Sequence, residues 1–504
     1  MPANTFRQMP TTDELPYALY TAEQVRRLDH LTIHEFGIAG LELMERAGRA
    51  AFKRLQQLWP QAKRICVVTG VGNNAGDGFV LARLAQQAGL HVDVLQLGEQ
   101  EKLGGDARIN ADRWWDMSGS WLPFKQLPLK TDVIVDAIFG TGLQRDVTGS
   151  WAVAIEMINA HAAARFALDI PSGLNADNGQ VMGTTIKADA TITFIGLKRG
   201  MFTGAGREYC GQISFDALAV PAKIFASEIL SSRRLDWAKC RQLIRPRQRH
   251  AHKGDFGHVL VVGGNRGYSG AVRLAAEAAA RCGAGLVSIA THPAHAAMLN
   301  NGRPELMVSA IENDEQLEVL LAKANAVVLG PGLGQNDWAE ILFRKVMASG
   351  LPLVLDADGL NLLARHSQRR EHLVITPHPG EASRLLGENV AQLQADRFVA
   401  VEKLQQRFAC TVVLKGSGSL IASGGTQPVA LCSDGNPGMA SGGMGDVLSG
   451  MIAAFLAQGF AEDEAAELGV SLHARAADVA AAEQGEIGLL ASDLFPAARQ
   501  LLNE

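Results

Sequence analysis

Short apolar runs rich in β-branched residues alternate with alanine-rich segments along almost the whole chain. In the first half these runs are RICVVTG (64–70), HVDVLQLG (91–98), TDVIVDAIFG (131–140), ARFALDIPSG (164–173) and DATITFIGLK (189–198). In the second half they are HVLVVGG (258–264), GLVSIAT (285–291), NAVVLGPGLG (325–334), PLVLDADG (352–359), HLVITPHPG (372–380) and TVVLKGSG (411–418). Continuous apolar strands separated by helices are typical of parallel sheets covered on both faces. The pattern predicts an α/β fold whose ligands bind beyond the carboxyl ends of the strands.

A basic segment divides the chain into two parts of similar length. Between residues 231 and 255, eight Lys and Arg residues stand against only Asp236 and Asp255, which is typical of a solvated connector. A chain of 504 residues is also too long for one ordinary core and suits two. We therefore predict two tandem α/β domains, 1–232 and 233–504, with residues 1–16 as a loose arm.

Composition excludes several classes of protein. The formal net charge of −5 and the pI near 6.2 give no reason to expect a nucleic-acid partner. No run of about 18 apolar residues occurs, so we expect no membrane span. The six cysteines form no CxxC pair, and the first twenty residues lack the apolar segment of a signal peptide. The sequence therefore predicts a reduced, cytoplasmic protein that acts on small molecules.

The first glycine-rich segment, GVGNNAGDG (70–78), follows the strand expected at 64–70. We expect it to form a loop before a helix at 79–89, whose free N–H groups can bind an anion. A Rossmann dinucleotide site is disfavoured, because the spacing is GxGxxxG and no ribose-binding acid ends the next strand. No lysine follows the glycines, which excludes a Walker P-loop. A tight turn capped by Asp77 is the alternative for this segment taken alone.

Two carboxylates end neighbouring strands of the predicted sheet. Asp136 follows the apolar residues VIV in the run at 131–140, and Asp169 follows FAL in the run at 164–173. A buried strand that finishes in a carboxylate is costly unless the charge has a partner or a function. Asn74, Asp136 and Ser172 also form an all-oxygen set suited to a hard cation. The first half therefore has a candidate site at its strand ends.

The motifs of the first half carry a family resemblance. VTGVGNNAGDGFVLAR, DAIFGTGLQRDVTG, LDIPSGLNADNG and TFIGLKRGMFTGAGREYCG resemble the epimerase domain of the NAD(P)H-hydrate repair enzymes, over about residues 20–215. The resemblance implies interconversion of the R and S forms of NAD(P)H hydrate with a potassium ion in the site. The substrate residues that it implies are Asn73, Asn74, Ala75, Gly76, Asp77, Gly140, Thr141, Gly142, Leu143, Gln144, Arg145, Asp146 and Asp169.

The same resemblance assigns more particular roles. It implies that potassium is held by Asn74, Asp136 and Ser172, and that Asp169 contacts the nicotinamide hydrate. We take Asp169 as the residue that moves protons while the hydroxyl-bearing ring carbon loses and regains its stereochemistry. Lys198 is expected to be exposed, with assistance to Asp169 as the alternative.

The second half contains its own glycine-rich segment, GMASGGMGDVLSG (438–450), which runs into an apolar helix. Such a turn makes an anion-binding site of backbone N–H groups. Asp446 at the helix start can accept a proton from a substrate hydroxyl aimed at a nucleotide's terminal phosphate, a capping aspartate being the alternative. The segment KGSGS (415–419) follows a strand and can bind nucleotide phosphates. Glu381 in TPHPGEA (376–382) is a candidate for holding hydrated magnesium.

These elements in this order resemble the ribokinase-like fold. HKGDFGHVLVVGGN (252–265), with YSGAVRLAAEAAARCGAG, LGPGLG, DADGLNLL, TPHPGE and GGMGDVLSG, resembles the NAD(P)H-hydrate dehydratase domain over about residues 245–502. The resemblance implies nucleotide-dependent dehydration that restores NADH or NADPH and releases phosphate. The implied contacts to the S hydrate are Ala271, Gly332, Gly334, His378 and Asp446. The implied nucleotide-binding residues are Lys415, Gly416, Ser417, Gly418, Ser419 and Gly445.

Together the two resemblances imply one bifunctional repair enzyme, in which the epimerase supplies the dehydratase with the S hydrate. ADP is the implied co-substrate and gives AMP and phosphate, with Mg²⁺ in the dehydratase site and K⁺ in the epimerase site. A homo-oligomer is also implied. The alternative is a ribokinase-like small-molecule kinase with an N-terminal accessory or scaffold domain, which predicts a stable phosphorylated product. Asp136 and Asp169 argue against a pure scaffold, because a scaffold needs no buried acids.

Overall fold

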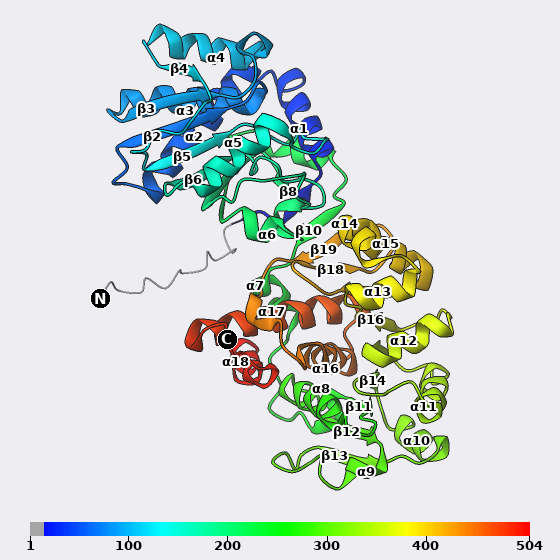
Figure 1. The fold of residues 1–504 in the computed structure, drawn as a ribbon. Helices are drawn as coiled ribbons and strands as arrows, with labels where there is room; N and C mark the ends of the chain where they lie inside the picture. The colour runs from blue at the N-terminus through cyan, green and yellow to red at the C-terminus, as the bar shows by residue number, and fades with distance from the viewer. Residues whose placement is uncertain (1–14) are drawn as a thin grey trace, which may run out of the picture. The chain divides into compact units, whose positions relative to one another are not determined.

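The computed structural model describes residues 15–504, which divide into two compact units between Arg233 and Arg234. Each unit is built on a sheet with helices on both faces (Figure 1), so the prediction of a two-part α/β protein is confirmed. The predicted boundary between residues 232 and 233 lies next to the observed one. The predicted loose arm, 1–16, falls mostly on residues 1–14, which lie outside the described residues.

A seven-stranded, fully parallel sheet forms the centre of the first unit, in the order β4-β3-β2-β5-β6-β7-β9. Its strands are β2 (Arg64–Thr69), β3 (His91–Gln96), β4 (Trp121–Pro123), β5 (Val133–Ala137), β6 (Ala164–Leu168), β7 (Ala190–Phe194) and β9 (Gln212–Asp216). Outside this seven-stranded sheet, β1 (Ala18–Tyr20) pairs with β10 (Ser232–Arg234) and with β8 (Leu197–Lys198). Strands β2, β3, β5, β6 and β7 match the apolar runs of the sequence, whereas β9 lies outside them.

Both faces of this sheet are covered, which explains why its strands are continuously apolar. Val67 and Val135 pack on one face with residues of the first four helices, and Val68 packs on the other face with Ile155. The helices of the unit are α1 (Ala22–His34), α2 (Gly40–Leu58), α3 (Asn73–Gln87), α4 (Gly105–Asp116), α5 (Gly149–Ala160) and α6 (Gly206–Tyr209).

The strands of the second unit pair into a sheet in the order β13-β12-β11-β14-β15-β16-β17-β18-β19. The pairings are parallel as far as β17 and antiparallel beyond it. The strands are β11 (His258–Gly263), β12 (Leu286–Thr291), β13 (Met307–Ala310), β14 (Ala326–Leu329), β15 (Leu353–Leu355), β16 (Leu373–Ile375), β17 (Thr411–Leu414), β18 (Ser419–Ala422) and β19 (Val429–Cys432).

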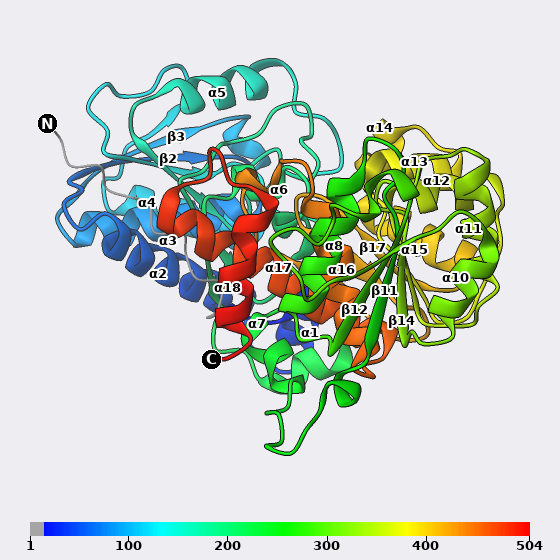
Figure 2. The same cartoon turned by 90° about the horizontal axis from the view of Figure 1, so that it is seen from below.

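Helices again cover both faces of this second sheet. The face formed by α8 (Ser269–Arg281), α16 (Met444–Ala457), α17 (Glu462–Gln484) and α18 (Leu494–Leu501) encloses one core, and in Figure 2 these helices lie on the side away from α10 and α11. The remaining helices are α7 (Trp237–Cys240), α9 (Pro293–Ala296), α10 (Asp314–Leu321), α11 (Asp337–Met347), α12 (Ala357–Arg365), α13 (Pro379–Leu386), α14 (Val390–Ala395) and α15 (Arg397–Phe408). Within residues 15–504, no helix has the length and apolar character needed to cross a membrane.

The strand orders locate a crevice in each sheet. In the first unit the chain builds outward from β2 to β4 and then resumes on the other side at β5. In the second unit the same reversal occurs between β11 and β14. Ligands of doubly wound sheets bind at such switch points, beyond the carboxyl ends of the strands.

Candidate active sites

The three predicted potassium ligands of the first unit lie together at the switch point. The Ser172 hydroxyl donates a hydrogen bond to Asp136 Oδ1 at 2.6 Å, and the Ser172 backbone N–H donates to Oδ2 at 2.8 Å. Asn74 comes from the start of α3, and its Nδ2 donates to the carbonyl oxygens of Phe139 at 3.0 Å and Leu168 at 3.2 Å. The loops after β5 and β6 therefore converge on the first turn of α3.

This cluster has the donor chemistry of a monovalent cation site. Asn74 Oδ1 is buried and has no hydrogen-bond partner, whereas a buried polar atom normally has one. Asp136 is fully buried, and burial raises its pKa to about 6 in spite of its hydrogen bonds with Ser172. A hard cation would satisfy the free amide oxygen and favour the ionised carboxylate. The residues present therefore fit potassium.

Asp169 and Lys198 form a buried ion pair beside this cluster. The Lys198 ammonium donates to Asp169 Oδ1, to Thr193 Oγ1 at 2.8 Å and to the Phe194 carbonyl at 3.1 Å. Lys198 has no exposed surface, so the expectation of an exposed lysine is wrong. A lysine is rarely buried without a partner, and here the carboxylate at the end of β6 is that partner. The Asp169 backbone has φ +67°, a strained conformation of the kind that occurs at functional sites.

The segment that contains Asp77 is helical. Helix α3 begins at Asn73 with Gly72 as its N-cap, so the predictions of a loop over 73–78 and of a helix beginning at 79 are wrong. Two of its glycines allow close packing: a Cβ at Gly76 would lie 2.2 Å from Met44 Sδ, and one at Gly78 would lie 2.7 Å from Ala137 Cβ. Because Gly72 is the N-cap and Asp77 lies inside the helix, Asp77 is not a cap.

Asp77 and Asp29 add two further carboxyls to the Asp169–Lys198 pair. Burial, then the charges of Asp169 and Asp29, raise the pKa of Asp77 well above its usual range. Asp29 lies on α1, one turn after Val25, whose side chain packs against Gly196 close to Lys198. Burial also raises the pKa of Asp29 to about 7. The Lys198 charge opposes both shifts, so Asp77 and Asp29 lie within its electrostatic influence, and Asp29 was not among the predicted site residues.

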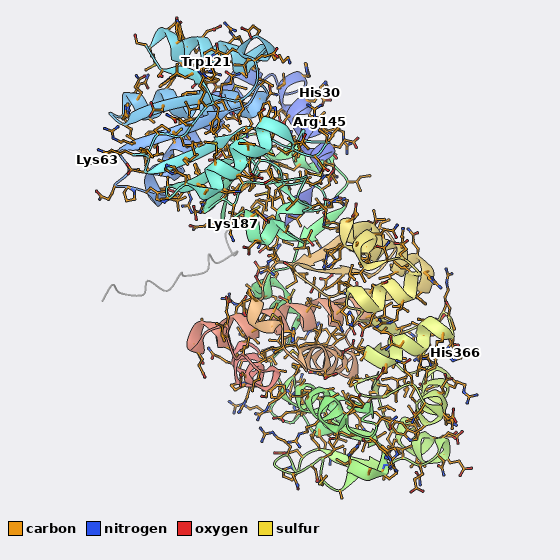
Figure 3. All side chains as sticks on the ribbon, viewed as in Figure 1. His30, Lys63, Trp121, Arg145, Lys187 and His366 are labelled. Atoms are coloured by element: carbon orange, nitrogen blue, oxygen red, sulfur yellow. The ribbon has the colours of Figure 1, made fainter. Side chains whose placement is uncertain are left out.

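The other predicted substrate residues of the first unit fall into two groups. Ala75 and Gly76 are buried in the packing of α3, whereas Asn73 is exposed at its N-terminus. Gly140 borders the site, because a Cβ there would lie 3.7 Å from Asn74 Cβ and 3.8 Å from Asp169 Oδ2. Beyond it the loop opens to solvent; its exposed members are Gly142, Gln144, Arg145 (labelled in Figure 3) and Asp146, and its half-buried members are Thr141 and Leu143.

The centre of the second site is a buried ion pair between Lys415 and Asp356. Lys415 Nζ lies 2.7 Å from Asp356 Oδ1, and the Ser449 hydroxyl donates to Asp356 Oδ2 at 2.7 Å. Burial acts to raise the pKa of Asp356, but Lys415 and these hydrogen bonds together lower it. Asp356 was not among the predicted site residues. The signal was a carboxylate at the end of a buried strand, as at Asp136 and Asp169.

His378 is the N-cap of α13 and Glu381 lies in the first turn of that helix, beside this ion pair. His378 caps α13, with its Nδ1 accepting from the Gly380 N–H at 3.0 Å, and its backbone N–H donates to Glu381 Oε2 at 2.8 Å. Glu381 Oε2 is also 3.8 Å from Lys415 Nζ. Burial raises the pKa of Glu381 to about 7, with Lys415 opposing the shift. Half of the His378 side chain is exposed, so it can meet a ligand.

Asp446 lies in the first turn of α16, whose N-cap Gly443 has φ +90°. Its neighbour Gly445 approaches the ion pair so closely that a Cβ there would lie 3.3 Å from Lys415 Nζ. Burial, and then the Asp356 carboxylate, raise the pKa of Asp446 to about 7 against the influence of Lys415. A carboxyl with this pKa at a helix N-terminus is suited to accept a proton near a bound anion.

The predicted hydrate contacts Ala271, Gly332 and Gly334 gather at the switch point between β11 and β14. A Cβ at Gly332 would lie 3.4 Å from Ala271 Cβ. Asn265, which the sequence interpretation missed, donates from Nδ2 to the Leu333 carbonyl at 3.0 Å. The Gly334 N–H donates to Asp358 Oδ2 at 2.9 Å. This turn is therefore tied to the ends of both β11 and β15.

The KGSGS segment forms the turn between β17 and β18. Gly416 has φ +147° and Gly418 has φ +70°, conformations that favour glycine. Gly416 and Ser417 are exposed, and the Ser419 hydroxyl donates to the Gly416 carbonyl at 3.3 Å. The turn begins at Lys415 and so connects directly to the central ion pair. Among residues 15–504, no group of three or more His, Cys, Asp and Glu side chains is arranged to hold a metal ion.

Two α/β units, each with buried acids and an ammonium beyond its strand ends, define a protein with two small-molecule active sites. The second unit matches the family model described as NAD(P)H-hydrate dehydratase over residues 259–499, and the first matches that described as YjeF-related protein N-terminus over residues 40–200. The bifunctional NAD(P)H-hydrate repair enzyme Nnr of Coxiella burnetii is 48% identical over 486 residues, which cover 96% of this chain and 99% of that protein. The chain belongs to the family of bifunctional NAD(P)H-hydrate repair enzymes.

Two further similarities agree with this assignment. The enzyme of the same name from Escherichia coli K12 is 40% identical, and the match covers 100% of this chain and 97% of that protein. A crystal structure of a ribokinase-like superfamily protein from Enterococcus faecalis is similar with a TM-score of 0.50 and 29% identity, covering 54% of this chain and 96% of that chain. The ribokinase-like prediction for the second unit is therefore confirmed.

Proposed function

We propose that this chain repairs NAD(P)H hydrate in two steps, with residues 1–232 as the epimerase domain and 233–504 as the dehydratase domain. The first interconverts the R and S hydrates, and the second dehydrates the S form to NAD(P)H while ADP becomes AMP and phosphate. One observation carries the proposal. This member of the family has a site with buried acids in each of its two units, one around Asp169 and one around Asp446. A coupled assay on mixed R and S hydrates tests it, with recovery of NAD(P)H as the readout.

In the dehydratase, Asp446 removes the proton of the ring hydroxyl, whose oxygen attacks the terminal phosphorus of ADP. The bond from that phosphorus to AMP breaks, and the hydroxyl becomes a phosphate ester. The ring nitrogen then expels phosphate, and loss of a proton from the adjacent carbon forms the ring double bond. Lys415, held by Asp356, and the N–H groups at the start of α16 face the transferring phosphate. Glu381 would hold hydrated Mg²⁺, which neutralises phosphate charge when bound.

The pH dependence of dehydration should report the ionisation of Asp446. We expect kcat/KM for the S hydrate to fall as the pH drops through about 7, because a base with that pKa is lost by protonation. Rates measured from acidic to alkaline pH in constant ionic strength test this. Glu381 also has a pKa of about 7, so Glu381→Gln is the control. If the fall in kcat/KM at acidic pH disappears in Glu381→Gln, the ionising group is Glu381 and not Asp446.

In the epimerase, the hydroxyl-bearing carbon is bonded to the ring nitrogen. Removal of the hydroxyl proton by Asp169 allows the carbon–nitrogen bond to open to an aldehyde, and closure on either face gives either epimer. The nitrogen needs a proton when the bond opens, and Asp77, kept protonated by burial beside Asp169, is the candidate donor. Lys198 keeps Asp169 in place. The potassium held by Asn74, Asp136 and Ser172 would supply positive charge next to the substrate.

Potassium should activate the epimerase and leave dehydration of pure S hydrate less affected. Ser172→Ala removes one oxygen ligand and is expected to raise the half-saturating K⁺ concentration about tenfold. The measurement is the epimerisation rate against KCl, with choline chloride keeping the ionic strength constant. Ser214→Ala, a hydroxyl change on β9 of the same sheet, is the matched control. An unchanged K⁺ response in Ser172→Ala would contradict the site.

The proposal also includes a homo-oligomeric, cytoplasmic enzyme with no nucleic-acid or membrane partner. All six cysteines are buried, and none forms a CxxC pair in the sequence, which agrees with a reducing compartment. The net charge of −5 is consistent with small-molecule ligands.

A further inference from the structure

A buried guanidinium lies behind the turn proposed to bind the nucleotide. Arg397, the first residue of α15, is 2% exposed. Among the residues that the structure describes, no carboxylate forms an ion pair with it, and its Nε has no hydrogen-bond partner. Buried arginines are normally paired, because a buried charge is costly. The position of Arg397 therefore calls for a functional explanation.

The Arg397 guanidinium donates hydrogen bonds to backbone carbonyl oxygens on both sides of the turn. Arg397 Nη2 donates to the Leu414 carbonyl at 3.2 Å and to the Gly418 carbonyl at 3.1 Å, on either side of the turn. Nη1 lies so close to Gly416 that a Cβ there would be 2.2 Å from it. Any larger residue at Gly416 would push the guanidinium away, and the φ of +147° at that position also favours glycine.

These contacts determine the direction in which the turn presents its polar groups. Arg397 holds the carbonyl oxygens of Leu414 and Gly418 on its own side of the turn, whereas Gly416 and Ser417 lie on the exposed side. Lys415 at the start of the turn points to Asp356 instead. The uncompensated positive charge behind the turn also favours an anionic ligand in front of it.

We propose that Arg397 is a positioning residue that fixes the Lys415–Ser419 turn for the phosphates of a nucleoside diphosphate. The proposal rests on the assignment of this turn to the nucleotide. It concerns the nucleotide rather than the hydrate, because Arg397 contacts the turn between β17 and β18, and none of the proposed hydrate contacts belongs to that turn.

The test compares Arg397→Lys and Arg397→Met in the full-length chain. We expect the KM for ADP to rise about tenfold or more, because the turn loses charge-assisted hydrogen bonds that a lysine cannot reproduce at both carbonyls. The KM for the S hydrate and the kcat at saturating ADP should change by less than about threefold. Direct titration of ADP should show the same loss of affinity. The epimerase rate of each variant reports whether the chain is intact.

A matched control exists at the other end of α15. Arg369 donates to the backbone carbonyls of Gln406 at 2.8 Å and Arg407 at 2.9 Å, so Arg369→Lys makes the same chemical change away from the turn. It should leave the ADP KM unaltered. Equal increases in the KM of ADP and of hydrate, or no change in either, would overturn the positioning role. Lys415→Met separates the two proposals: if it leaves ADP binding intact, the nucleotide assignment itself is wrong.

Discussion

Replacement of Asp446 by asparagine is expected to slow dehydration about 1000-fold or more while epimerisation by the same chain continues at its normal rate. Asparagine keeps the size of the side chain but cannot accept the hydroxyl proton, and general-base catalysis contributes about 100- to 10,000-fold. Asp446 has a pKa of about 7 and lies beside Lys415 and Asp356, so its loss removes the base without removing the phosphate contacts. The appearance of NAD(P)H from pure S hydrate and ADP, followed by near-ultraviolet absorbance, is the measurement.

Asp337→Asn is the control for this substitution. Asp337 is an exposed first-turn acid of α11, so its change tests the loss of a carboxylate at a helix start without touching the site. Nucleotide affinity should be nearly unchanged in Asp446→Asn. If the wild-type chain yields a stable phosphorylated hydrate and no NAD(P)H, the kinase alternative replaces the dehydratase. If the KM for ADP rises in Asp446→Asn by the same factor as the dehydration rate falls, Asp446 is a binding residue and not the base.

Both sites could be placed from the sequence because the topology of a parallel sheet determines where its ligands bind. Continuous apolar runs predicted the long strands correctly, and the carboxyl ends of those strands meet at one edge. Asp136 near the end of β5, Asp169 and Lys415 directly after β6 and β17, and Glu381 in the first turn after β16 come together in their own units. The strands β4, β9, β13, β18 and β19 were not predicted. Of these, β4, β9 and β13 are edge strands with exposed or half-buried residues, so they need not be continuous apolar runs.

The roles of other site residues could not be predicted, because these roles depend on partners that are far away in the sequence. Lys198 reads as a surface lysine until Asp169, far back in the chain, is placed against it. Asp29 reads as a polar position of an amphipathic helix, and Arg397 reads as a solvated first residue of α15. The glycines of α3 predicted a loop, but they allow the helix to pack closely on α2 and β5. In each case tertiary packing overrode a local pattern.

Asp169→Asn is expected to reduce epimerisation about 1000-fold or more, so that recovery of NAD(P)H from a mixed hydrate stalls once the S form is consumed. The remaining R form should then disappear only at the spontaneous rate measured without protein. Because the substitution leaves the Lys198 ammonium buried without its partner, it is expected to cost about 3–5 kcal/mol of stability. The paired variant Asp169→Asn/Lys198→Met removes both charges, and a thermal unfolding measurement shows whether the fold is kept.

The control for Asp169 is an ion pair at the opposite edge of the same sheet. Asp189 precedes β7 and contacts Arg165 at 3.0 Å, so Asp189→Asn breaks a carboxylate–guanidinium pair without approaching the strand ends that carry the site. Epimerisation should continue in that variant. Full recovery of NAD(P)H by a folded Asp169→Asn/Lys198→Met chain, faster than the spontaneous rate, would move the proton transfer to the remaining acids, Asp77 and Asp29. Stalling in both Asp169 variants, with dehydration of S hydrate intact, would place it at Asp169.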